Sequence, residues 1–190
     1  MERRSPPFFQ NTKDEHPDKK VEIWFQDESR FGQQGMLTKI WAEKNTRPVV
    51  DKQNGRASAY LFGAVNPLSG DSHGIILPSV NTDAMNLFLI GLSKKMSRWK
   101  HCLLIVDGAG WHRSDDLKVP KNISLLQLPP YSPELNCIER LWGWMKDNFL
   151  ALKTFDNLDA VFDAGCHAWQ QASEAIIRSV CHTPWLPSAN

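Results

Sequence analysis

The stretch Cys102-Leu103-Leu104-Ile105-Val106-Asp107-Gly108 decides the fold class. Its first five residues form an unbroken apolar run, which is typical of a strand buried on both faces, as in the parallel part of a sheet. A second apolar run, Ile123–Leu128, follows a short polar segment and ends at Pro129-Pro130. Together these runs indicate two strands in the interior of an α/β protein.

The residues before this stretch follow the two-residue period of antiparallel strands. Alternation of apolar and polar residues from Val21 to Phe25 predicts a strand that ends at Asp27. Residues 1–20 are polar and contain three prolines, so we expect a flexible lead-in and one domain over residues 21–190. Three further candidate strands are Met36–Ala42, Ala59–Val65 and His73–Leu77.

Helical periodicity marks three other segments. Residues 82–96 begin at the capping residue Thr82 and place their large apolar side chains on one face. Two more helices are expected over residues 136–150 and 156–180. Antiparallel strands followed by alternating helices and strands predict an α/β architecture, a mixed sheet covered by helices.

The composition excludes several classes of protein. Of the 190 residues, 42% are hydrophobic and 23% are charged, and no apolar run approaches the ~18 residues that span a bilayer. The start lacks the apolar segment of a secretory signal, so we expect a cytoplasmic protein without a membrane partner. The four cysteines form no CxxC pair and are predicted to be reduced thiols rather than zinc ligands.

The charge balance bears on nucleic-acid binding. Lys and Arg number 22 against 21 Asp and Glu, which gives a formal net charge of +1. Stand-alone DNA-binding modules usually carry a basic excess. If this protein acts on nucleic acid, metal ions or another domain must supply much of the attraction.

Three acids occupy special positions. Asp27 ends the first predicted strand, Asp107 ends the buried run, and Glu139 lies in the first turn of the helix predicted from residue 136. Ligands of open α/β sheets bind beyond the carboxyl ends of parallel strands, where these side chains can converge. Two carboxylates about 4 Å apart repel by roughly 4 kcal/mol at an effective dielectric of about 20, so a cluster needs shared protons or cations. Carboxylates suit Mg²⁺ or Mn²⁺, and two such ions can clamp a phosphoryl substitution.

Each acid also has an ordinary structural interpretation. Asp27 fits an acid at the end of a strand, and Asp107-Gly108 fits a turn. Asn136 followed by Glu139 fits a capping box, in which Glu139 bonds the backbone at the start of its own helix. The spacing alone leaves these alternatives open.

Three segments surround these acids: WFQDESRF at residues 24–31, VDGAGWH at 106–112 and LPPYSPELNCIERLW at 128–142. They resemble the three blocks of the IS630/Tc1/mariner transposase superfamily. The third segment is the most specific, because its tyrosine-serine-proline-acid-leucine-asparagine run closes on an acid and then on Leu-Trp. The resemblance covers about residues 21–185.

The resemblance implies a ribonuclease-H-like domain, a five-stranded mixed sheet of three antiparallel strands followed by parallel strands. It implies that Asp27, Asp107 and Glu139 form a catalytic DDE triad that holds two Mg²⁺ ions, with Mn²⁺ as a substitute. Glu139 follows Asp107 by 32 positions, slightly fewer than is usual in the family, and Glu134 matches a non-catalytic acid. The implied activity is DNA transposition, in which an endonuclease step at the transposon ends precedes transfer of the 3′-OH into target DNA.

The sequence departs from the family pattern at three places. Gly108 stands where relatives often have Asn, and Cys137 stands where Pro is common. Nothing before Val21 can form the helix-turn-helix domain that relatives carry, so we expect the catalytic half alone. The near-neutral charge then predicts weak, sequence-indifferent DNA affinity.

The partners implied by the resemblance are DNA, namely terminal inverted repeats and a TA-containing target, a second copy in a homodimer, and a separate helix-turn-helix frame. The setting implied is the nucleoid of a prokaryote. Five residues are candidates for DNA contact or for support of the acids, and each has an ordinary structural alternative, namely packing, a structural hydrogen bond, capping or surface charge. They are Trp111, His112, Asn136, Arg140 and Lys146.

Two rival functions fit the same motifs. One is a different ribonuclease-H-like nuclease, such as a junction resolvase or an RNase H. The other is a catalytically inactive copy that binds DNA or protein through an intact fold.

Overall fold

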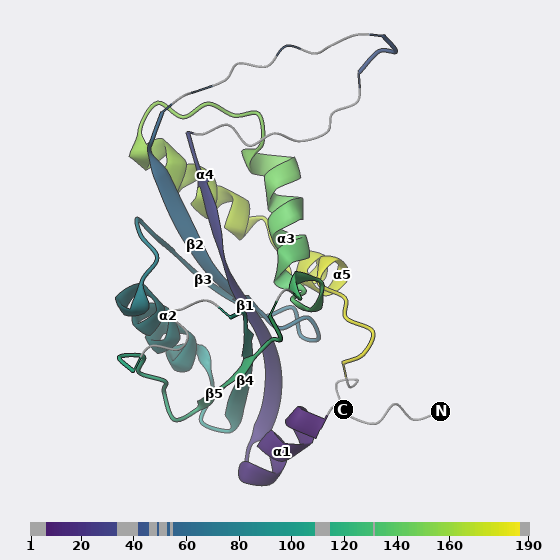
Figure 1. Cartoon of the computed structure of the whole chain (residues 1–190). Helices are drawn as coiled ribbons and strands as arrows, with labels where there is room; N and C mark the ends of the chain where they lie inside the picture. Colours follow the sequence, from purple (N-terminus) through teal and green to yellow (C-terminus); the bar gives the residue numbers. More distant parts are fainter. Residues whose placement is uncertain are drawn as a thin grey trace.

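The computed structural model describes residues 7–33, 42–45, 49, 53, 55–108, 115–130 and 132–186. Its strands are β1 (Lys20–Gly32), β2 (Ser58–Val65), β3 (Ser72–Leu77), β4 (Lys100–Val106) and β5 (Ile123–Gln127). They form a five-stranded sheet in the order β3-β2-β1-β4-β5 (Figure 1). The pairs β1–β2 and β2–β3 are antiparallel, whereas β1–β4 and β4–β5 are parallel. The predicted mixed sheet of three antiparallel strands followed by parallel strands is confirmed.

Alternate residues of each strand serve two separate apolar cores, because successive side chains point to opposite faces of a sheet. In β1, Ile23 and Phe25 belong to one core and Trp24 to the other. In β4, Ile105 lies with Phe25, and Leu104 lies with Trp24. The odd or even position of a residue in these two strands therefore fixes the face on which its side chain lies.

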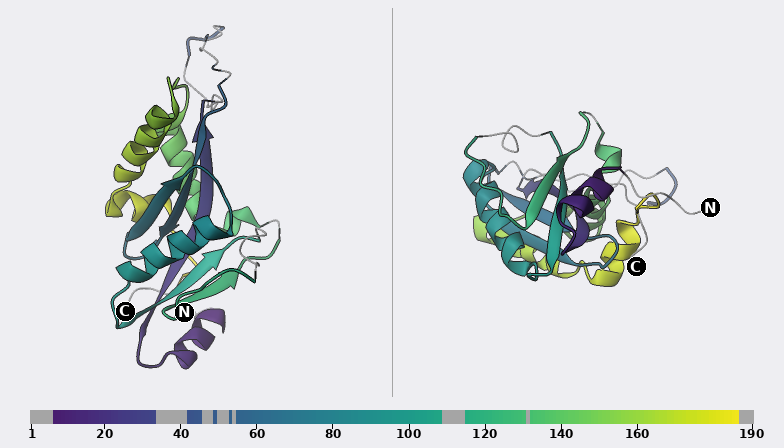
Figure 2. Two further views of the ribbon diagram at one scale, coloured as in Figure 1. Left: turned by 90° about the vertical axis from the view of Figure 1, so that its left-hand side faces the viewer. Right: turned by 90° about the horizontal axis from the view of Figure 1, so that it is seen from below.

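Different helices cover the two faces of the sheet. The helix α2 (Thr82–Lys95) buries Phe88 and Leu89 against the face that carries Trp24, which we call the α2 face. The opposite, α3 face is covered by α3 (Ile138–Met145), α4 (Leu158–Gln170), α5 (Glu174–Val180) and α1 (Pro7–Glu15). Figure 2 shows α2 and α5 on opposite sides of the sheet.

The strand β1 is longer than predicted, since it continues past Asp27 to Gly32. Its parallel pairing with β4 ends at Phe25–Ile105, whereas its antiparallel pairing with β2 runs on to Gly32–Ser58. The prediction that the strand ends at Asp27 is therefore wrong. Asp27 instead marks the place where β1 leaves its parallel neighbour.

The region before Val21 contains a helix where a flexible lead-in was expected. The helix α1 begins at Pro7, and proline is favoured at the first helical position because its missing N–H has no partner there in any case. Phe9 is buried against the α3 face. The expectation of an unstructured lead-in is wrong for this helix, which buries Phe9 and Thr12 and also packs Phe8 against the core.

Three other boundaries differ from prediction. The N-cap of α2 is Asn81 rather than Thr82, with the Asn81 side chain accepting from the Ala84 N–H. The helix α3 ends at Met145 and continues as a π-helical turn to Leu150. The single helix predicted over residues 156–180 is split into α4 and α5. Most of the predicted strand Met36–Ala42 lies outside the described residues.

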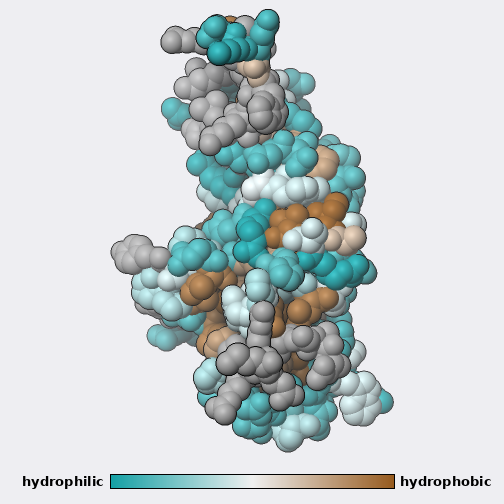
Figure 3. All heavy atoms as spheres, turned by 90° about the vertical axis from the view of Figure 1, so that its right-hand side faces the viewer, coloured by the Kyte–Doolittle hydropathy of each residue, from teal (hydrophilic) through white to brown (hydrophobic). Residues whose placement is uncertain are grey.

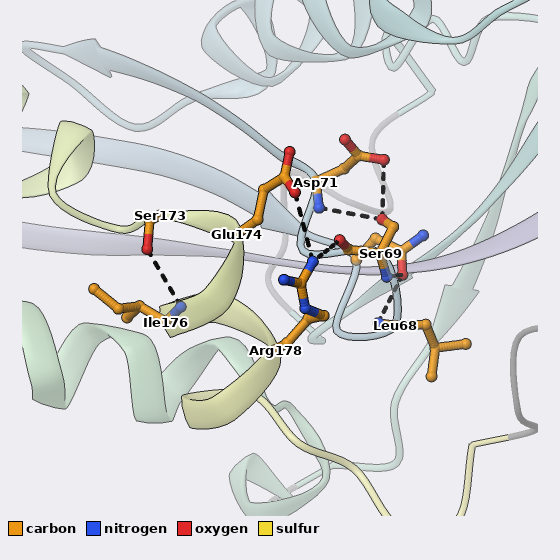
Figure 4. A network of polar contacts seen from close by, with 8 residues as sticks. Leu68, Ser69, Asp71, Ser173, Glu174, Ile176 and Arg178 are labelled. Atoms are coloured by element: carbon orange, nitrogen blue, oxygen red, sulfur yellow. Dashed lines mark hydrogen bonds and ion pairs between the residues drawn. The ribbon is translucent and has the colours of Figure 1, made fainter.

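The helix α5 is held against the turn between β2 and β3. Gly70 in this turn has a φ of +83°, and a Cβ there would lie 2.5 Å from the carbonyl oxygen of Glu174. Arg178 donates a hydrogen bond to the carbonyl of Ser69 over 2.8 Å (Figure 4). Because glycine tolerates this φ and this approach, the turn locks the C-terminal helix onto the sheet.

The surface and the helix lengths give two further facts. On the face that carries α3 and α5, the described surface is mostly hydrophilic, with apolar patches at mid-height (Figure 3). Among the described residues, none of the helices combines the length and the apolar character needed to span a bilayer.

Candidate active site

Asp27 and Asp107 lie just beyond the carboxyl ends of the parallel pair β1–β4. The last paired residues are Phe25 and Ile105, and each aspartate follows two positions later. Two positions along an extended chain return to the same face. Both aspartates are therefore expected on the α3 face, beyond the carboxyl ends of the parallel strands, where ligands of open α/β sheets bind.

The end of β5 holds the backbone around Asp107. The N–H of Leu128 donates to the carbonyl of Val106 over 2.8 Å, and Nε2 of Gln127 donates to the carbonyl of Asp107 over 3.3 Å. The backbone bond from Leu128 extends the parallel ladder by one step beyond the strands, and the side-chain bond from Gln127 supports the next residue. They bring the proline-rich segment after β5 next to the acids.

Glu139 completes a shared cavity of about 480 Å³. It lies in the first turn of α3, and its side chain is exposed. The cavity is built from β1, the end of β4, the segment after β5 and the start of α3. Its lining residues are Asp27, Asp107, Gly108, Leu128, Pro129, Pro130, Ser132, Pro133, Asn136 and Glu139.

The surroundings of Asp27 strongly affect its protonation. Its side chain is only 8% exposed, and its Oδ2 accepts a hydrogen bond from Nε1 of Trp142 over 2.9 Å. Burial, and then the charge of Glu139, raise the pKa of Asp27 to about 7, while hydrogen bonds from the Glu28 backbone N–H and from Trp142 act in the opposite direction. Asp27 and Glu139 therefore interact electrostatically across the cavity.

The donors around the cavity match a hard divalent cation in kind. The carboxylates supply oxygen ligands. Asn136 also lines the cavity, and its buried Oδ1 has no hydrogen-bond partner in the described part of the chain. A cation would also relieve the repulsion that raises the pKa of Asp27. Among the residues that the structure describes, however, no group of three or more His, Cys, Asp or Glu side chains lies close enough together to hold a metal ion. The chemistry of the donor set fits, but the acids do not form a ready-made cluster.

The capping-box interpretation of Asn136 and Glu139 is wrong. The N-cap of α3 is Cys137, whose side chain makes no capping bond. Nδ2 of Asn136 instead donates to the carbonyl of Gln26 over 2.9 Å, in a fully buried contact. Because Gln26 precedes Asp27, this bond joins the start of α3 to the strand at the point where the first aspartate lies.

The other candidate residues lie elsewhere. The guanidinium of Arg140 donates to the carbonyls of Val180 and His182 over 2.8 and 2.7 Å, so it ties α3 to the C-terminal end of α5. Lys146 begins the π-helical turn, two turns of helix away from Glu139. Neither residue lines the cavity. Trp111 and His112 lie outside the described residues.

Sequence reasoning missed the contact between Trp142 and Asp27. Trp142 fits the apolar stripe of its helix, a pattern that indicates a core residue, and it does lie in the core of the α3 face. The available signal was chemical, since a buried indole N–H usually finds an acceptor. A tryptophan on the helix that carries Glu139, facing a strand that carries an aspartate, is a candidate donor.

A mixed sheet of this strand order, with acids beyond its parallel strands, defines a ribonuclease-H-like fold. The structure is similar to a chain of the Mos1 strand transfer complex, with a TM-score of 0.62 and 16% identity over 92% of this chain and 54% of that chain. It is also similar to a chain of the mariner Mos1 paired end complex with Mg, with a TM-score of 0.63 and 16% identity over 85% of this chain and 51% of that chain. The protein thus spans about half the length of these solved chains.

Residues 22–161 match the DDE superfamily endonucleases, and the chain belongs to this family. An uncharacterised protein of Sinorhizobium fredii (strain NBRC 101917 / NGR234), y4pE/y4sA, is 43% identical over 113 residues. The aligned part is 60% of this chain and 84% of the relative. The resemblance to DDE enzymes stated from the three motif segments is confirmed at the level of this family.

Proposed function

We propose that this protein is the catalytic domain of a DDE transposase, in which Asp27, Asp107 and Glu139 are the catalytic acids and the ligands of two Mg²⁺ ions. The single observation that carries the proposal is that three acids from three distant segments line one cavity. Membership of the DDE superfamily endonucleases supports it. Neighbours of the same fold in Mos1 complexes, solved with Mg and with Mn, support the choice of metal.

In the proposed reaction, water attacks a phosphorus at the transposon end, and the bond from phosphorus to the 3′ oxygen breaks. The 3′ oxygen takes up a proton and becomes a 3′-OH. This hydroxyl loses its proton and attacks a phosphorus of target DNA, and the bond from that phosphorus to the 3′ oxygen of the target strand breaks, so that this oxygen leaves and takes up the proton. Divalent ions, when bound, would neutralise the phosphate and polarise it for attack. No covalent bond between protein and DNA forms in either step.

The residues of the chain prepare this site. Asp27, with its pKa near 7, carries a proton part of the time at neutral pH and releases it when a cation takes its place. Gly108 lines the cavity without a side chain and leaves room beside Asp107. The proline-rich wall, Pro129, Pro130 and Pro133, lacks backbone N–H donors and so offers the substrate shape rather than hydrogen bonds.

A plasmid-nicking assay with Mn²⁺ tests the proposal. Glu139→Gln should reduce nicking by about a thousandfold or more, because one acid of the triad is lost. Glu134→Gln is the matched control, since Glu134 is also exposed, lies in the same motif and does not line the cavity. Equal nicking by Glu139→Gln and the wild type would remove Glu139 from the mechanism, and Asp107→Asn tests the second aspartate in the same way.

Strand transfer separates a transposase from other nucleases of this fold. A DNA end with a free 3′-OH should be joined to a TA-containing target in the presence of Mn²⁺ if the protein is a transposase. Nicking without joining would favour a junction resolvase or an RNase H. The proposed partners are therefore transposon ends, target DNA, a second copy of the chain and a helix-turn-helix protein that supplies sequence recognition.

A further inference from the structure

The indole of Trp142 joins the helix that carries Glu139 to the side chain of Asp27. Its Nε1 donates to Oδ2 of Asp27 over 2.9 Å, and both side chains are buried. Trp142 also lies three positions after Glu139 on α3, and residues at this spacing are neighbours on a helix. The helix that carries one acid therefore also carries the group that holds another.

Trp142 lies over a glycine on the strand beside Asp27. Gly63 of β2 is the register partner of Asp27 in β1, and a Cβ on Gly63 would lie 2.5 Å from Cη2 of Trp142. Any other residue at position 63 would therefore push the ring away. The missing side chain creates the space in which the indole can reach across to the aspartate.

The same arrangement repeats one strand further out. Gly74 of β3 is the register partner of Gly63, and a Cβ on Gly74 would lie 2.6 Å from Cε2 of Trp169. The rings of Trp142 and Trp169 lie 5.9 Å apart between centroids. We call Gly63 and Gly74 the glycine row. It seats two indoles side by side, of which the one nearer β1 bonds the acid.

A second tryptophan shows that this bond is not a requirement of packing. Trp24 is 1% exposed in the core of the α2 face, and its Nε1 has no hydrogen-bond partner among the residues that the structure describes. The fold thus tolerates a buried indole without an acceptor. The N–H of Trp142, in contrast, is aimed at a carboxylate that lines the cavity, and bonds to a charged acceptor are stronger than neutral ones.

We propose that Trp142 is a positioning residue, which holds Oδ2 of Asp27 and so fixes the rotation of the carboxylate. The backbone N–H of Glu28 also donates to this carboxylate, and the lone pairs that neither donor occupies are left for the ligand of the site. The inference rests on the proposed function of Asp27. It adds Trp142 and the glycine row to the machinery of the site, although neither touches the reacting atoms. Groups that orient a metal ligand through a hydrogen bond typically change metal affinity or activity 10–100-fold when removed.

The test compares two substitutions that remove the same atoms. Trp142→Phe retains an aromatic ring and removes the N–H that Asp27 accepts. Trp169→Phe is the matched control, because Trp169 lies on the same glycine row one strand further from Asp27. Calorimetric titration with Mn²⁺ should show about tenfold weaker binding for Trp142→Phe and less than about a twofold change for Trp169→Phe.

Kinetics provide a readout that packing alone would not change. The Mn²⁺ concentration that gives half-maximal nicking should rise about tenfold in Trp142→Phe, while saturating Mn²⁺ restores much of the maximal rate. If Trp142→Phe does not fold, benzothienylalanine at position 142 replaces only the N–H by sulfur and keeps the bicyclic shape. Wild-type Mn²⁺ affinity in either variant would overturn the inference.

The outcomes separate this inference from the proposed function. If the wild type binds Mn²⁺ and nicks DNA but Trp142→Phe behaves identically, only the role of Trp142 fails. If the wild type neither binds Mn²⁺ nor nicks, and Asp27→Asn changes nothing, the proposed function fails and the role of Trp142 fails with it.

Discussion

The two faces of the sheet are built from the same strands but differ in what they hold. The α2 face is an apolar core in which even an indole N–H, that of Trp24, has no partner among the described residues. The α3 face also has an apolar core, but it places Asp27, Gly63 and Gly74 at one register across three strands. The indoles of Trp142 and Trp169 pack over the two glycines. Both faces therefore stabilise the fold, but only the α3 face also holds a carboxylate beside a cavity.

The largest stability effect is expected on the α2 face. Leu89 is fully buried, so Leu89→Ala should lower the free energy of unfolding by about 2–5 kcal/mol, because it leaves a cavity. Leu87 lies on the same helix but is 54% exposed, and Leu87→Ala should change the free energy by less than about 0.5 kcal/mol. Urea unfolding measures both. Folded Leu89→Ala should bind Mn²⁺ like the wild type, and weakened binding would show that the two faces are not independent.

The next largest effect on the free energy of unfolding is expected at Asp27 on the α3 face, where a substitution should stabilise the fold. The pKa of Asp27 is about 7 in the folded chain against 3.8 in the unfolded one, so between these pH values the folded chain binds a proton that the unfolded chain releases. The contribution of Asp27 to stability is therefore present below about pH 4 and is lost as the pH rises to about 7. In EDTA at pH 8, Asp27→Asn should raise the free energy of unfolding by about 2–3 kcal/mol, with little gain at pH 4.

Glu139→Gln sharpens this prediction. The charge of Glu139 is the second cause of the raised pKa of Asp27, after burial. Its removal should also stabilise the fold at pH 8, but by less than Asp27→Asn does. A wild type whose stability does not decline between pH 4 and pH 8 relative to Asp27→Asn would show that Asp27 is not perturbed as described.

A third, smaller effect is expected at two glycines, of which Gly63 faces the Trp142 ring and Gly143 faces open space. Gly63→Ala should destabilise the fold by about 1–3 kcal/mol, because the new Cβ meets the Trp142 ring. Gly143 of α3 has open space around its Cβ position, so Gly143→Ala should stabilise the helix by up to about 1 kcal/mol. Thermal unfolding of both variants measures the difference. Equal effects at the two positions would show that Trp142 can move away from Gly63 freely.

The sequence was sufficient for the sheet and for the location of the acids. Alternation in β1 and the apolar run of β4 predicted both strands, because a period of two and a buried run are local signals. Asp107 does follow the end of β4, whereas Asp27 lies where β1 leaves β4 and not at the end of its strand. These two residues and Glu139, at the start of α3, do line one cavity. Their catalytic roles stay predictions.

What the sequence could not provide depends on partners that are distant along the chain. The extension of β1 past Asp27 is fixed by pairing with β2. The polar run Glu28-Ser29-Arg30 does not show the alternation that predicts a strand. Asn136 follows the pattern of a helix cap, but its side chain bonds a carbonyl of β1 110 positions away. The pattern of Trp142 is that of any core residue, since only the fold brings Gly63 beneath its ring.

The smallest effect concerns a titratable group on the α2 face, His73. Its Nε2 is buried and has no hydrogen-bond partner within the described ranges, and its ring packs against Phe88 at 5.2 Å between centroids. Burial, and then the charge of Lys95, lower the pKa of His73 below its usual 6.5. The unfolded chain therefore binds a proton that the folded chain resists, so the stabilising contribution of His73 is complete above pH 6.5 and declines as the pH falls.

Lowering the pH should therefore raise the free energy of unfolding through Asp27 on the α3 face and lower it through His73 on the α2 face. Because the two effects have opposite signs, variants of Asp27 and His73 can separate them. In an Asp27→Asn background, stability should fall between pH 7 and pH 5, and adding His73→Gln should make this fall shallower. The pKa of His101 is also lowered, mainly by burial, but His101 is present in both proteins and cancels in the comparison. Urea unfolding at the two pH values measures the change, and identical slopes for the single and double variants would show that protonation of His73 does not oppose folding.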